Sequence, residues 1–375
     1  MRRRRRSFAP LVALAAAAAL AAGACGGPIL ANAPAATAAP RAKATPEPAR
    51  VDPQPVAFPA DDAPHDRLTE WWYVTGHLAA ADGERFGYEF VIFRAQRGSF
   101  PVTWASHVAI TRETTGAFAY AQRSEVGPQV DMRDRLARGA SAAFVLGGDT
   151  PWTMLVAADG SMTLSGDAGG TELALQLAAG GAPVLHDTDG WVGFADAGGS
   201  YYYSRTRMPT VGTFTSNGTT RAVSGSSWFD HQWGDFIAIG GGGWDWFALN
   251  LDDGSDLMLS FVRDASGGYP LVYGTWVDPR GRVRRIDGAD IALSRLGSWV
   301  SPHTGTTWPA GWRVRIASLG LDAVVQPTVA DQELDTRAST GVVYWEGSCT
   351  VSATIGGAAV AGRAYVELTG YASLR

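Results

Sequence analysis

A chain of 375 residues is long enough for two domains with buried cores, and its two cysteines exclude a disulfide-stapled scaffold. The formal charge is −5; removing five arginines with the predicted leader leaves 26 basic against 36 acidic residues, a charge of −10. A mildly acidic mature chain argues against a nucleic-acid partner, and the single lysine, Lys43, excludes Schiff-base chemistry in the predicted folded part.

The N-terminus carries the pattern of an export signal. Residues 1–24 combine a run of five arginines with an apolar segment over 8–22 that is too short to cross a bilayer comfortably. The small residues before Cys25 resemble a bacterial lipobox, in which Cys25 becomes the lipidated N-terminus; ordinary cleavage near Ala24 is the alternative. Residues 25–57 are rich in Ala and Pro and predict a disordered tether. We therefore expect an exported cell-envelope lipoprotein, periplasmic or extracellular, anchored in the membrane.

From residue 58 onward the chain is a series of short strand-like runs. Alternating apolar residues are separated by glycine-containing turns, as on either side of Asp82-Gly83. Turn signals at this spacing predict an all-β protein, a sandwich or a barrel. We expect an N-terminal domain over 58–217 and a C-terminal domain over 218–375. Asn217-Gly218 would be the boundary, although this pair could equally be a hairpin turn.

Residues 223–251 contain four of the 14 Trp together with acids and a histidine. Two strand-like segments flank the glycine-rich stretch 237–243, which predicts a long hairpin with a flexible tip. Strand alternation puts Asp230 on one face and His231 with Trp233 on the other, so Asp230 and His231 cannot share a pocket unless a bulge intervenes. An aspartate against Trp in a dry pocket has a raised pKa and can act as a general acid. A Trp-rich core with merely hydrogen-bonded Asp and His is the alternative.

Two further stretches hold candidate pocket residues. In the run 70–78, Trp72 faces one way and Tyr73 the other, so one face can line a cavity while the other packs outside. A purely structural aromatic strand is the alternative. His107 lies in an apolar strand, where a lone histidine is more often a hydrogen-bonded core residue than a catalyst.

The run 201–207 combines three Tyr with two Arg. A cavity-lining role and a buried pairing with an acid are both open for these arginines. Glu346 and Glu367 lie in apolar strands, so we expect each to meet a buried donor, with Arg205 and Arg207 as candidate partners.

Several familiar signatures are missing from the sequence. The six histidines are isolated, with no His-x-His and no HExxH, and no CxxC occurs, so no metal site is indicated. The lack of a G-x-S-x-G elbow argues against a serine hydrolase, and no P-loop or dinucleotide fingerprint follows a strand. We therefore predict neither a metal nor a cofactor.

Seven motifs in order resemble one known family. The chain is similar, from residue 58 to its end, to the carotenoid 1,2-hydratase and AttH-type lipocalin-like family. The resemblance implies two tandem lipocalin-like antiparallel β-barrel domains, with a large apolar cavity in or between them. The motifs are EWWYVTGH at 70–77, YYYSRTR at 201–207, WFDHQW at 228–233, GWDWF at 243–247, DQEL at 331–334, WEG at 345–347 and VELTGY at 366–371.

The resemblance also implies a chemistry. Family members include hydratases that add water to a terminal isoprenoid double bond without a cofactor. Asp230 would then be the acid, and His231 and Trp233 would orient water and stabilise charge. Trp244 and Trp246 would add aromatic wall, and Asp245 between them a second carboxylate.

Two functions stay open from the sequence. One is a cofactor-independent hydro-lyase acting on an isoprenoid or lipid. The other is a non-catalytic carrier that holds such a molecule at the membrane and serves a transporter, which a lipid anchor and tether suit at least as well. For either function the candidate ligand-binding residues are Trp72, Tyr73, His107, Tyr201, Tyr203, Arg205, Trp228, Trp244, Asp245 and Trp246.

Overall fold

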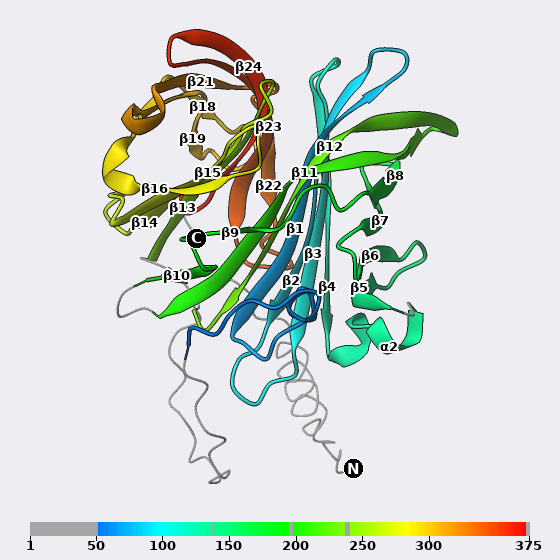
Figure 1. The fold of residues 1–375 in the computed structure, drawn as a ribbon. Helices are drawn as coiled ribbons and strands as arrows, with labels where there is room; N and C mark the ends of the chain where they lie inside the picture. Colours follow the sequence, from blue (N-terminus) through cyan, green and yellow to red (C-terminus); the bar gives the residue numbers. More distant parts are fainter. Residues whose placement is uncertain (1–51, 137–138, 195–197, 237–240, 373–375) are drawn as a thin grey trace, which may run out of the picture.

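The computed structural model describes residues 52–136, 139–194, 198–236 and 241–372, and Figure 1 shows two β-barrels side by side. All strand pairs are antiparallel, and each sheet curls into a nearly closed barrel, so the prediction of two tandem lipocalin-like barrels is confirmed. The predicted signal segment, Cys25 and the tether up to residue 51 lie outside the described residues. Within the described part, no helix is long and apolar enough to cross a membrane.

The first barrel is one sheet with the strand order β4-β3-β2-β1-β12-β11-β8-β7-β6-β5, and β9 and β10 pair with β11. Its two ends approach each other, since β4 contacts β5 and β7. Three short turns, η1 (Ala60–Asp62), η2 (Pro128–Val130) and α2 (Arg133–Leu136), contact β5. The strands are β1 (Thr69–Ala80), β2 (Arg85–Ala95), β3 (Thr103–Arg112), β4 (Ala117–Val126), β5 (Ala140–Leu146), β6 (Trp152–Ala157), β7 (Met162–Ala168), β8 (Thr171–Leu177), β9 (Val184–Leu185), β10 (Trp191–Gly193), β11 (Gly199–Ser216) and β12 (Thr219–Gly234).

The second barrel has the strand order β16-β15-β14-β13-β24-β23-β21-β20-β17, with β22 paired to β23 and a separate β18–β19 hairpin. The short turn η5 (Ala317–Leu319) connects the paired strands β20 and β21, whereas η4 (Gly288–Asp290) connects β16 to β17, the two ends of the strand order. The strands are β13 (Gly241–Leu251), β14 (Asp256–Asp264), β15 (Leu271–Val277), β16 (Val283–Asp287), β17 (Ile291–Arg295), β18 (Ser298–Val300), β19 (Thr307–Pro309), β20 (Trp312–Ile316), β21 (Leu321–Pro327), β22 (Glu333–Asp335), β23 (Val343–Ile355) and β24 (Ala358–Leu368).

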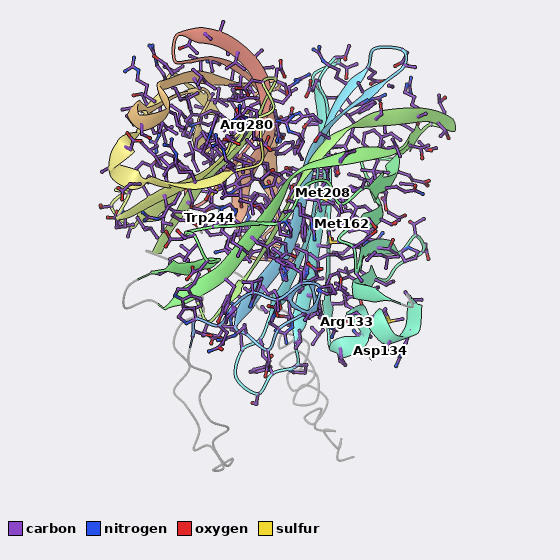
Figure 2. All side chains as sticks on the ribbon, in the orientation of Figure 1. Arg133, Asp134, Met162, Met208, Trp244 and Arg280 are labelled. Carbon is purple, nitrogen blue, oxygen red and sulfur yellow. The ribbon has the colours of Figure 1, made fainter. Side chains whose placement is uncertain are left out.

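Each barrel encloses its own hydrophobic core. Strand β8 buries every second residue and exposes those between, which is the alternation that predicted the strands. Met162 and Met208 lie in the first core (Figure 2), and Phe247 and Trp312 lie in the second. A third buried cluster, made of residues from both barrels, fills the interface between them.

The chain passes from the first barrel to the second later than the expected boundary. Asn217 and Gly218 have positive φ angles of 50° and 72° and form the turn between β11 and β12, both in the first sheet. The long hairpin predicted around 237–243 is wrong, because β12 pairs with β1 and β11 whereas β13 pairs with β14 and β24. Alternation reveals a strand but not its neighbour. Residues 237–240 of the predicted tip lie outside the described residues.

The last part of the predicted tether is folded against the first barrel. Val56 packs against the first core, and the backbone N–H of Gln54 donates to the hydroxyl of Tyr201 at 2.8 Å. Arg67 forms an ion pair with Asp52 at 2.7 Å. Folded structure therefore begins before residue 58, because residues 52–56 pack against the first barrel and form hydrogen bonds and an ion pair with its residues.

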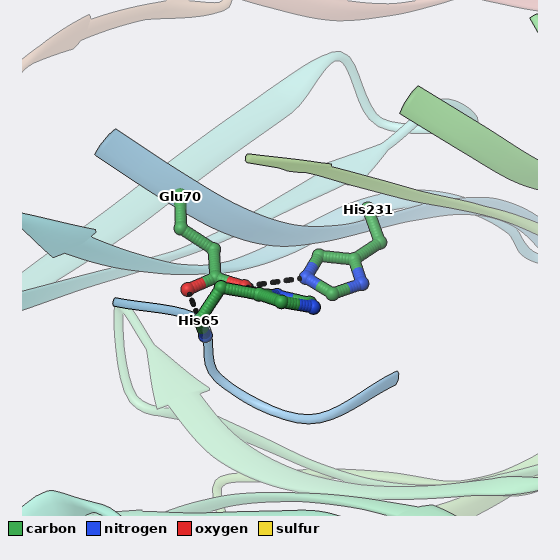
Figure 3. A group of neighbouring side chains, drawn as sticks. All are labelled: His65, Glu70 and His231. Carbon is green, nitrogen blue, oxygen red and sulfur yellow. Dashed lines mark hydrogen bonds and ion pairs between the residues drawn. The ribbon is translucent and has the colours of Figure 1, made fainter. Parts of the chain in front are cut away.

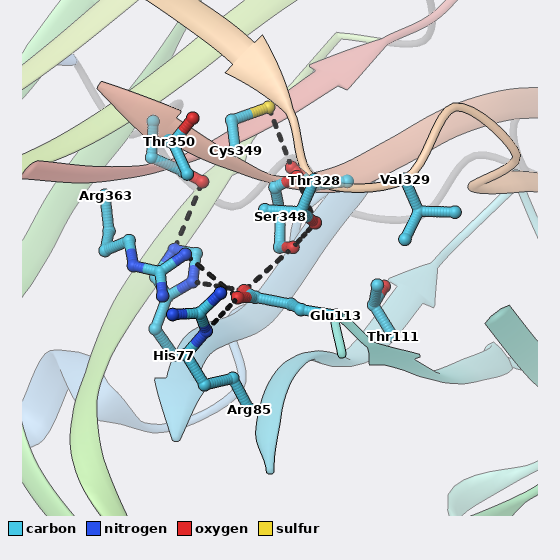
Figure 4. A network of polar contacts seen from close by, with 12 residues as sticks. His77, Arg85, Thr111, Glu113, Thr328, Val329, Ser348, Cys349, Thr350 and Arg363 are labelled. Atoms are coloured by element: carbon cyan, nitrogen blue, oxygen red, sulfur yellow. Dashed lines mark hydrogen bonds and ion pairs between the residues drawn. The ribbon is translucent and has the colours of Figure 1, made fainter. Parts of the chain in front are cut away.

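A polar cluster around Glu113, just after β3, ties the two barrels together (Figure 4). The Glu113 carboxylate accepts hydrogen bonds from Arg363 of β24 at 2.9 Å and from Ser348 of β23 at 3.2 Å. Arg85 and His77 of the first barrel lie 3.3 and 3.5 Å from it. Burial alone would raise the pKa of Glu113, but hydrogen bonds and charges from His77 and Arg363 outweigh burial and lower this pKa to about 2.

Candidate active site between the two barrels

Strands β1 and β12 form the wall of the first barrel that faces the second. They pair without a bulge, so their side chains alternate between the barrel interior and the interface. Tyr73 and Asp230 face a pocket at the interface, whereas His231 stacks on Trp72 inside the first barrel at 4.6 Å between ring centroids. The alternation predicted for Asp230 and His231 is thus present, and the two residues belong to different sites.

The interface pocket is lined by strands of both barrels and has a volume of about 60 Å³, which is room for a few water molecules. The enclosed space is smaller than the large apolar cavity expected from the family resemblance. Half-buried Trp71 and Trp244 stack across the interface at 6.2 Å between ring centroids. Trp244 is labelled in Figure 2. The lining residues are Trp71, Tyr73, Glu89, Phe93, Tyr202, Asp230 and Gln232 from the first barrel, and Trp244, Trp246, Ser260, Val262, Tyr273 and Glu367 from the second.

Asp230 of β12 is the best-supported acid of this pocket. Its carboxyl accepts hydrogen bonds from the hydroxyls of Tyr202 and Ser204 and, at 2.6 Å, from the indole N–H of Trp228. Burial raises the pKa of Asp230 to about 7, although these three hydrogen bonds act to lower it. Asp230 is therefore partly protonated at neutral pH and can donate a proton to a molecule in the pocket.

Two further carboxyls line the pocket. Burial raises the pKa of Glu367 to about 7, despite a hydrogen bond from Trp244. Burial also raises the pKa of Glu89 to about 8, although Tyr344 donates to its Oε1 at 2.8 Å. The other Glu89 oxygen, Oε2, has no hydrogen-bond partner within the described residues. The pocket therefore presents three carboxyls that hold protons near neutral pH.

Glu346 lies behind this pocket, where Tyr73 donates to its carboxyl at 2.6 Å. Burial, reinforced by the charges of Glu89 and Glu367, raises the pKa of Glu346 well above its ordinary value. The sequence suggested arginine partners for Glu346 and Glu367, but Arg207 instead forms an ion pair with Asp256 at 2.6 Å.

His186 and Glu89 were not predicted from the sequence as site residues. His186 is fully buried; its Nε2 bonds the Ser204 hydroxyl at 2.6 Å, and that hydroxyl donates to Asp230. Burial lowers the pKa of His186 to about 3, so it stays neutral and positions the serine. Nothing in the loop around His186 signals this role, whereas Glu89, an acid between apolar residues of β2, carried a signal that was overlooked.

Among the predicted ligand-binding residues, Tyr73, Trp244 and Trp246 line the pocket, and Trp228 lies beside it as a donor to Asp230. His107 is not a lining residue. It is buried and bonds Tyr344 at 2.7 Å and Ser339 at 3.0 Å, and burial lowers its pKa to about 3.

Most of the other predicted residues lie in or around the first barrel, away from the pocket. Trp72 donates from its indole N–H to the backbone of Asp62 at 2.9 Å, and Tyr203 donates to the carboxylate of the same aspartate. Tyr201 stacks on Trp233 at 5.1 Å between ring centroids. The guanidinium of Arg205 lies over the ring of Phe58 at 6.0 Å.

Asp245 lies on the face of β13 opposite to Trp244 and Trp246. Tyr269 donates to its carboxyl at 2.5 Å and Tyr371 at 2.8 Å, inside the second barrel. Burial raises the pKa of Asp245, and these hydroxyls and nearby arginines only partly offset it. Asp245 is therefore a buried acid of the second barrel and does not line the interface pocket.

A family model for AttH-like proteins matches residues 49–371, which is most of the chain. The chain belongs to the AttH-like family. The crystal structure of a protein assigned as an AttH from Nitrosomonas europaea matches this AttH-like chain with a TM-score of 0.76 at 29% identity, over 86% of this chain and 99% of that one.

Two further solved structures share the fold. Kievitone hydratase from Nectria haematococca matches with a TM-score of 0.69 at 16% identity, over 85% of this chain and 94% of that one. CghA in complex with Sch210972 matches with a TM-score of 0.55 at 14% identity, over 81% of this chain and 89% of that one. At these identities the likeness is one of fold alone. A search of curated proteins gave no match.

Proposed function

We propose that this AttH-like protein adds water to a carbon–carbon double bond of an apolar, isoprenoid-like molecule, without a cofactor. The observation that carries the proposal is the state of Asp230. This buried carboxyl faces an aromatic pocket, and its pKa of about 7 leaves much of it protonated at neutral pH. A protonated carboxyl in a site of low polarity is the acid that alkene hydration needs.

The proposed reaction balances without an added reagent. The Asp230 proton and the π electrons of the alkene form a new C–H bond at the less substituted carbon, which leaves a tertiary carbocation. The aromatic faces of Trp71 and Trp246 stabilise this cation. Water then forms the C–O bond, and the resulting oxonium returns a proton to the Asp230 carboxylate. The product is a tertiary alcohol, and the acid is regenerated.

The size of the pocket limits how a ligand can bind. A space of about 60 Å³ holds a few water molecules but not the end of an isoprenoid, so the ligand's reacting end must displace side chains. Trp71 and Trp244 are half-buried at the interface and suit this movement. We propose that the reacting end passes between these two rings while the apolar remainder stays between the barrels.

The relatives support hydration in a limited way. One structure with this fold is that of a kievitone hydratase, so the two-barrel architecture is compatible with hydration. The fold itself does not select the reaction, because function depends on the residues of a site. The acid chemistry of Asp230 therefore carries more of the proposal than the likeness does.

The test compares wild type with Asp230→Asn on a panel of isoprenoid alkenes in water labelled with heavy oxygen. The panel includes any apolar molecule that co-purifies with the protein and is identified by mass spectrometry. We expect labelled tertiary alcohol from wild type and a loss of at least about 100-fold in the variant, with ligand affinity preserved, because the amide cannot supply the proton.

The matched control is Asp256→Asn. Asp256 is also buried and also accepts hydrogen bonds from several side chains, but it does not line the pocket. Its turnover should stay near that of wild type. If wild type binds alkenes and returns all of them unchanged, the protein is a carrier and the hydration proposal fails.

A further inference from the structure

A second polar group lies inside the first barrel, on the face of β1 and β12 that points away from the pocket. It consists of His65, in the segment before β1, with Glu70 of β1 and His231 of β12 (Figure 3). Glu70 and His231 are completely buried, and only 13% of the His65 side chain is exposed. The proposed hydration does not use this group.

The three side chains converge on one point. Nδ1 of His65 lies 2.7 Å from Oε1 of Glu70, and Nε2 of His231 lies 2.9 Å from the same oxygen. The three atoms all lie within 4.8 Å of one another. The second Glu70 oxygen, Oε2, accepts the backbone N–H of His65 at 2.8 Å, which fixes the carboxylate and leaves Oε1 directed at both imidazoles.

We propose that His65, Glu70 and His231 bind one divalent transition-metal ion of the zinc class. Two imidazole nitrogens and one carboxylate oxygen form a donor set that suits zinc and its neighbours, and hard cations such as magnesium prefer oxygen donors alone. The histidines are isolated in the sequence, so only the pairing of β1 with β12 and the path of the segment before β1 bring them together.

The surroundings hold the proposed ligands in place. His65 stacks flat on Trp233 at 4.2 Å between centroids with 2° between the planes, and its Nε2 lies 3.4 Å from Asp61. A carboxylate behind a ligating histidine is a common outer partner in zinc sites. The ring of His231 stacks on Trp72. Its Nδ1 has no hydrogen-bond partner among the described residues. A metal bond at Nε2 would supply the fixed ring orientation that a second hydrogen bond usually gives.

The spacing is close to that of a metal site. Ligand atoms of a tetrahedral zinc ion with bonds of about 2.0–2.1 Å lie roughly 3.3 Å apart. Oε1 of Glu70 therefore has to retreat by about 0.5 Å from the two nitrogens, and the two nitrogens, which lie within 4.8 Å of each other, have to approach by up to about 1.5 Å; rotations of the glutamate and His65 side chains would provide both movements. The partly exposed edge of His65 is the route by which the ion reaches the group.

The proposed ion has a structural role. It joins the segment before β1 to the two strands that form the interface wall, so its binding stabilises the first barrel. Because the group and the interface pocket lie on opposite faces of these strands, metal binding and hydration can be tested separately.

The experiment measures metal content and metal binding of the purified full chain. Elemental analysis should find one zinc-class ion per chain. After the ion is removed with a chelator, cobalt(II) should bind with one equivalent, give visible absorption bands of a four-coordinate site, and raise the melting temperature. His65→Gln should weaken this binding by at least about 100-fold, because one of three ligands is lost.

A second variant and a control complete the test. Glu70→Gln should also lose the cobalt spectrum. The control is His303→Gln, which changes an exposed histidine paired with Asp331 and should leave cobalt binding unchanged. If cobalt does not bind saturably to wild type, or binds His65→Gln as tightly as wild type, the three residues are only a hydrogen-bonded network. His65 is partly exposed, so its variant decides the question even if Glu70→Gln does not fold.

Discussion

Asp230 accepts hydrogen bonds from Tyr202, Ser204 and Trp228, and each of them favours the ionised carboxylate. Burial favours the neutral acid more strongly, so the pKa of Asp230 is raised to about 7. Proton donor and carboxylate are therefore present in similar amounts at neutral pH. Because burial and hydrogen bonds shift the pKa of Asp230 in opposite directions, the loss of one hydrogen-bond donor should change this pKa measurably.

Replacing Trp228 by Phe removes the indole N–H donor at 2.6 Å and keeps an aromatic ring. Since the lost hydrogen bond favoured the ionised form, the pKa of Asp230 should rise further. If the lost hydrogen bond stabilised the ionised carboxylate by about 1.4 kcal/mol, the pKa of Asp230 should rise by about one unit. Turnover that requires the protonated acid falls as pH rises through this pKa, so the falling limb of the kcat profile should move to higher pH.

The same change can be measured without a substrate, by following the Asp230 carboxyl carbon by NMR as pH is varied. Wild type should titrate near pH 7 and the Trp228→Phe variant above it. Trp312→Phe, in the core of the second barrel, is the control and should leave the Asp230 titration in place. A midpoint for Trp228→Phe at or below that of wild type would contradict the proposed balance.

Strands β1 and β12 illustrate what a sequence can predict about an element. Alternation of side chains is a local property of the extended backbone, so the opposite orientations of Asp230 and His231 could be predicted. Strand pairing joins segments far apart in the chain, so the partners of β12 and β13 could not. For the same reason the role of His186 could not be predicted, since it depends on Ser204 of β11 and Thr275 of β15. Glu89 could have been found, because it is an acid among apolar residues of one strand.

The close packing between β1, β2 and β12 leads to a prediction at Gly76. A Cβ at this position would lie 2.5 Å from the ring of Tyr88 and 2.7 Å from the hydroxyl of Ser227, and these two side chains are hydrogen-bonded to each other at 2.6 Å. Gly76→Ala should therefore lower the free energy of unfolding by about 1–3 kcal/mol, measured by urea denaturation.

Gly193 of β10 is the matched control for this substitution. A Cβ there meets nothing within 4 Å, so Gly193→Ala should change the free energy of unfolding by less than about 0.5 kcal/mol. Equal effects of the two substitutions would mean that crowding at Gly76 does not limit the packing of these strands.

At the scale of the whole molecule, the interface between the barrels combines two kinds of carboxyl. Those of the pocket hold protons near neutral pH because burial dominates, as at Glu89 and Glu367. Glu113, in the cluster that ties the barrels together, is ionised because His77 and Arg363 outweigh burial. The interface thus separates its acid chemistry from the ion pairs that stabilise the barrel–barrel contact.

Glu113→Gln keeps the shape of the side chain and removes the charge that faces Arg363 and Arg85. We expect the free energy of unfolding to fall by about 1–3 kcal/mol at neutral pH. The pKa of Glu113 is about 2 in the folded protein against an ordinary 4.5. Its stabilisation is therefore fully present above about pH 4.5 and is lost as pH falls toward 2.

Urea denaturation of wild type and variant at several pH values between 3 and 7 checks this dependence, and the difference between the two should shrink toward the acid end. Glu172→Gln, a change at an exposed residue of β8, is the control and should have little effect at any pH. If the free energies of unfolding of wild type and Glu113→Gln differ by the same amount at every pH, the charge of Glu113 does not hold the barrels together.

The position of β24 in the second sheet has a consequence for the order in which the site is made during protein synthesis. β24 is the last strand described, yet it lies between β13 and β23 and carries Glu367 of the pocket. All strands of the first barrel, including β12 with Asp230, precede it in the chain. A growing chain can therefore complete its first barrel while Asp230 still faces water and is ionised at neutral pH like an ordinary carboxylate. Burial against the second barrel, which is complete only with β24, raises the pKa of Asp230 to about 7, so the proton donor is formed only when both barrels are in place.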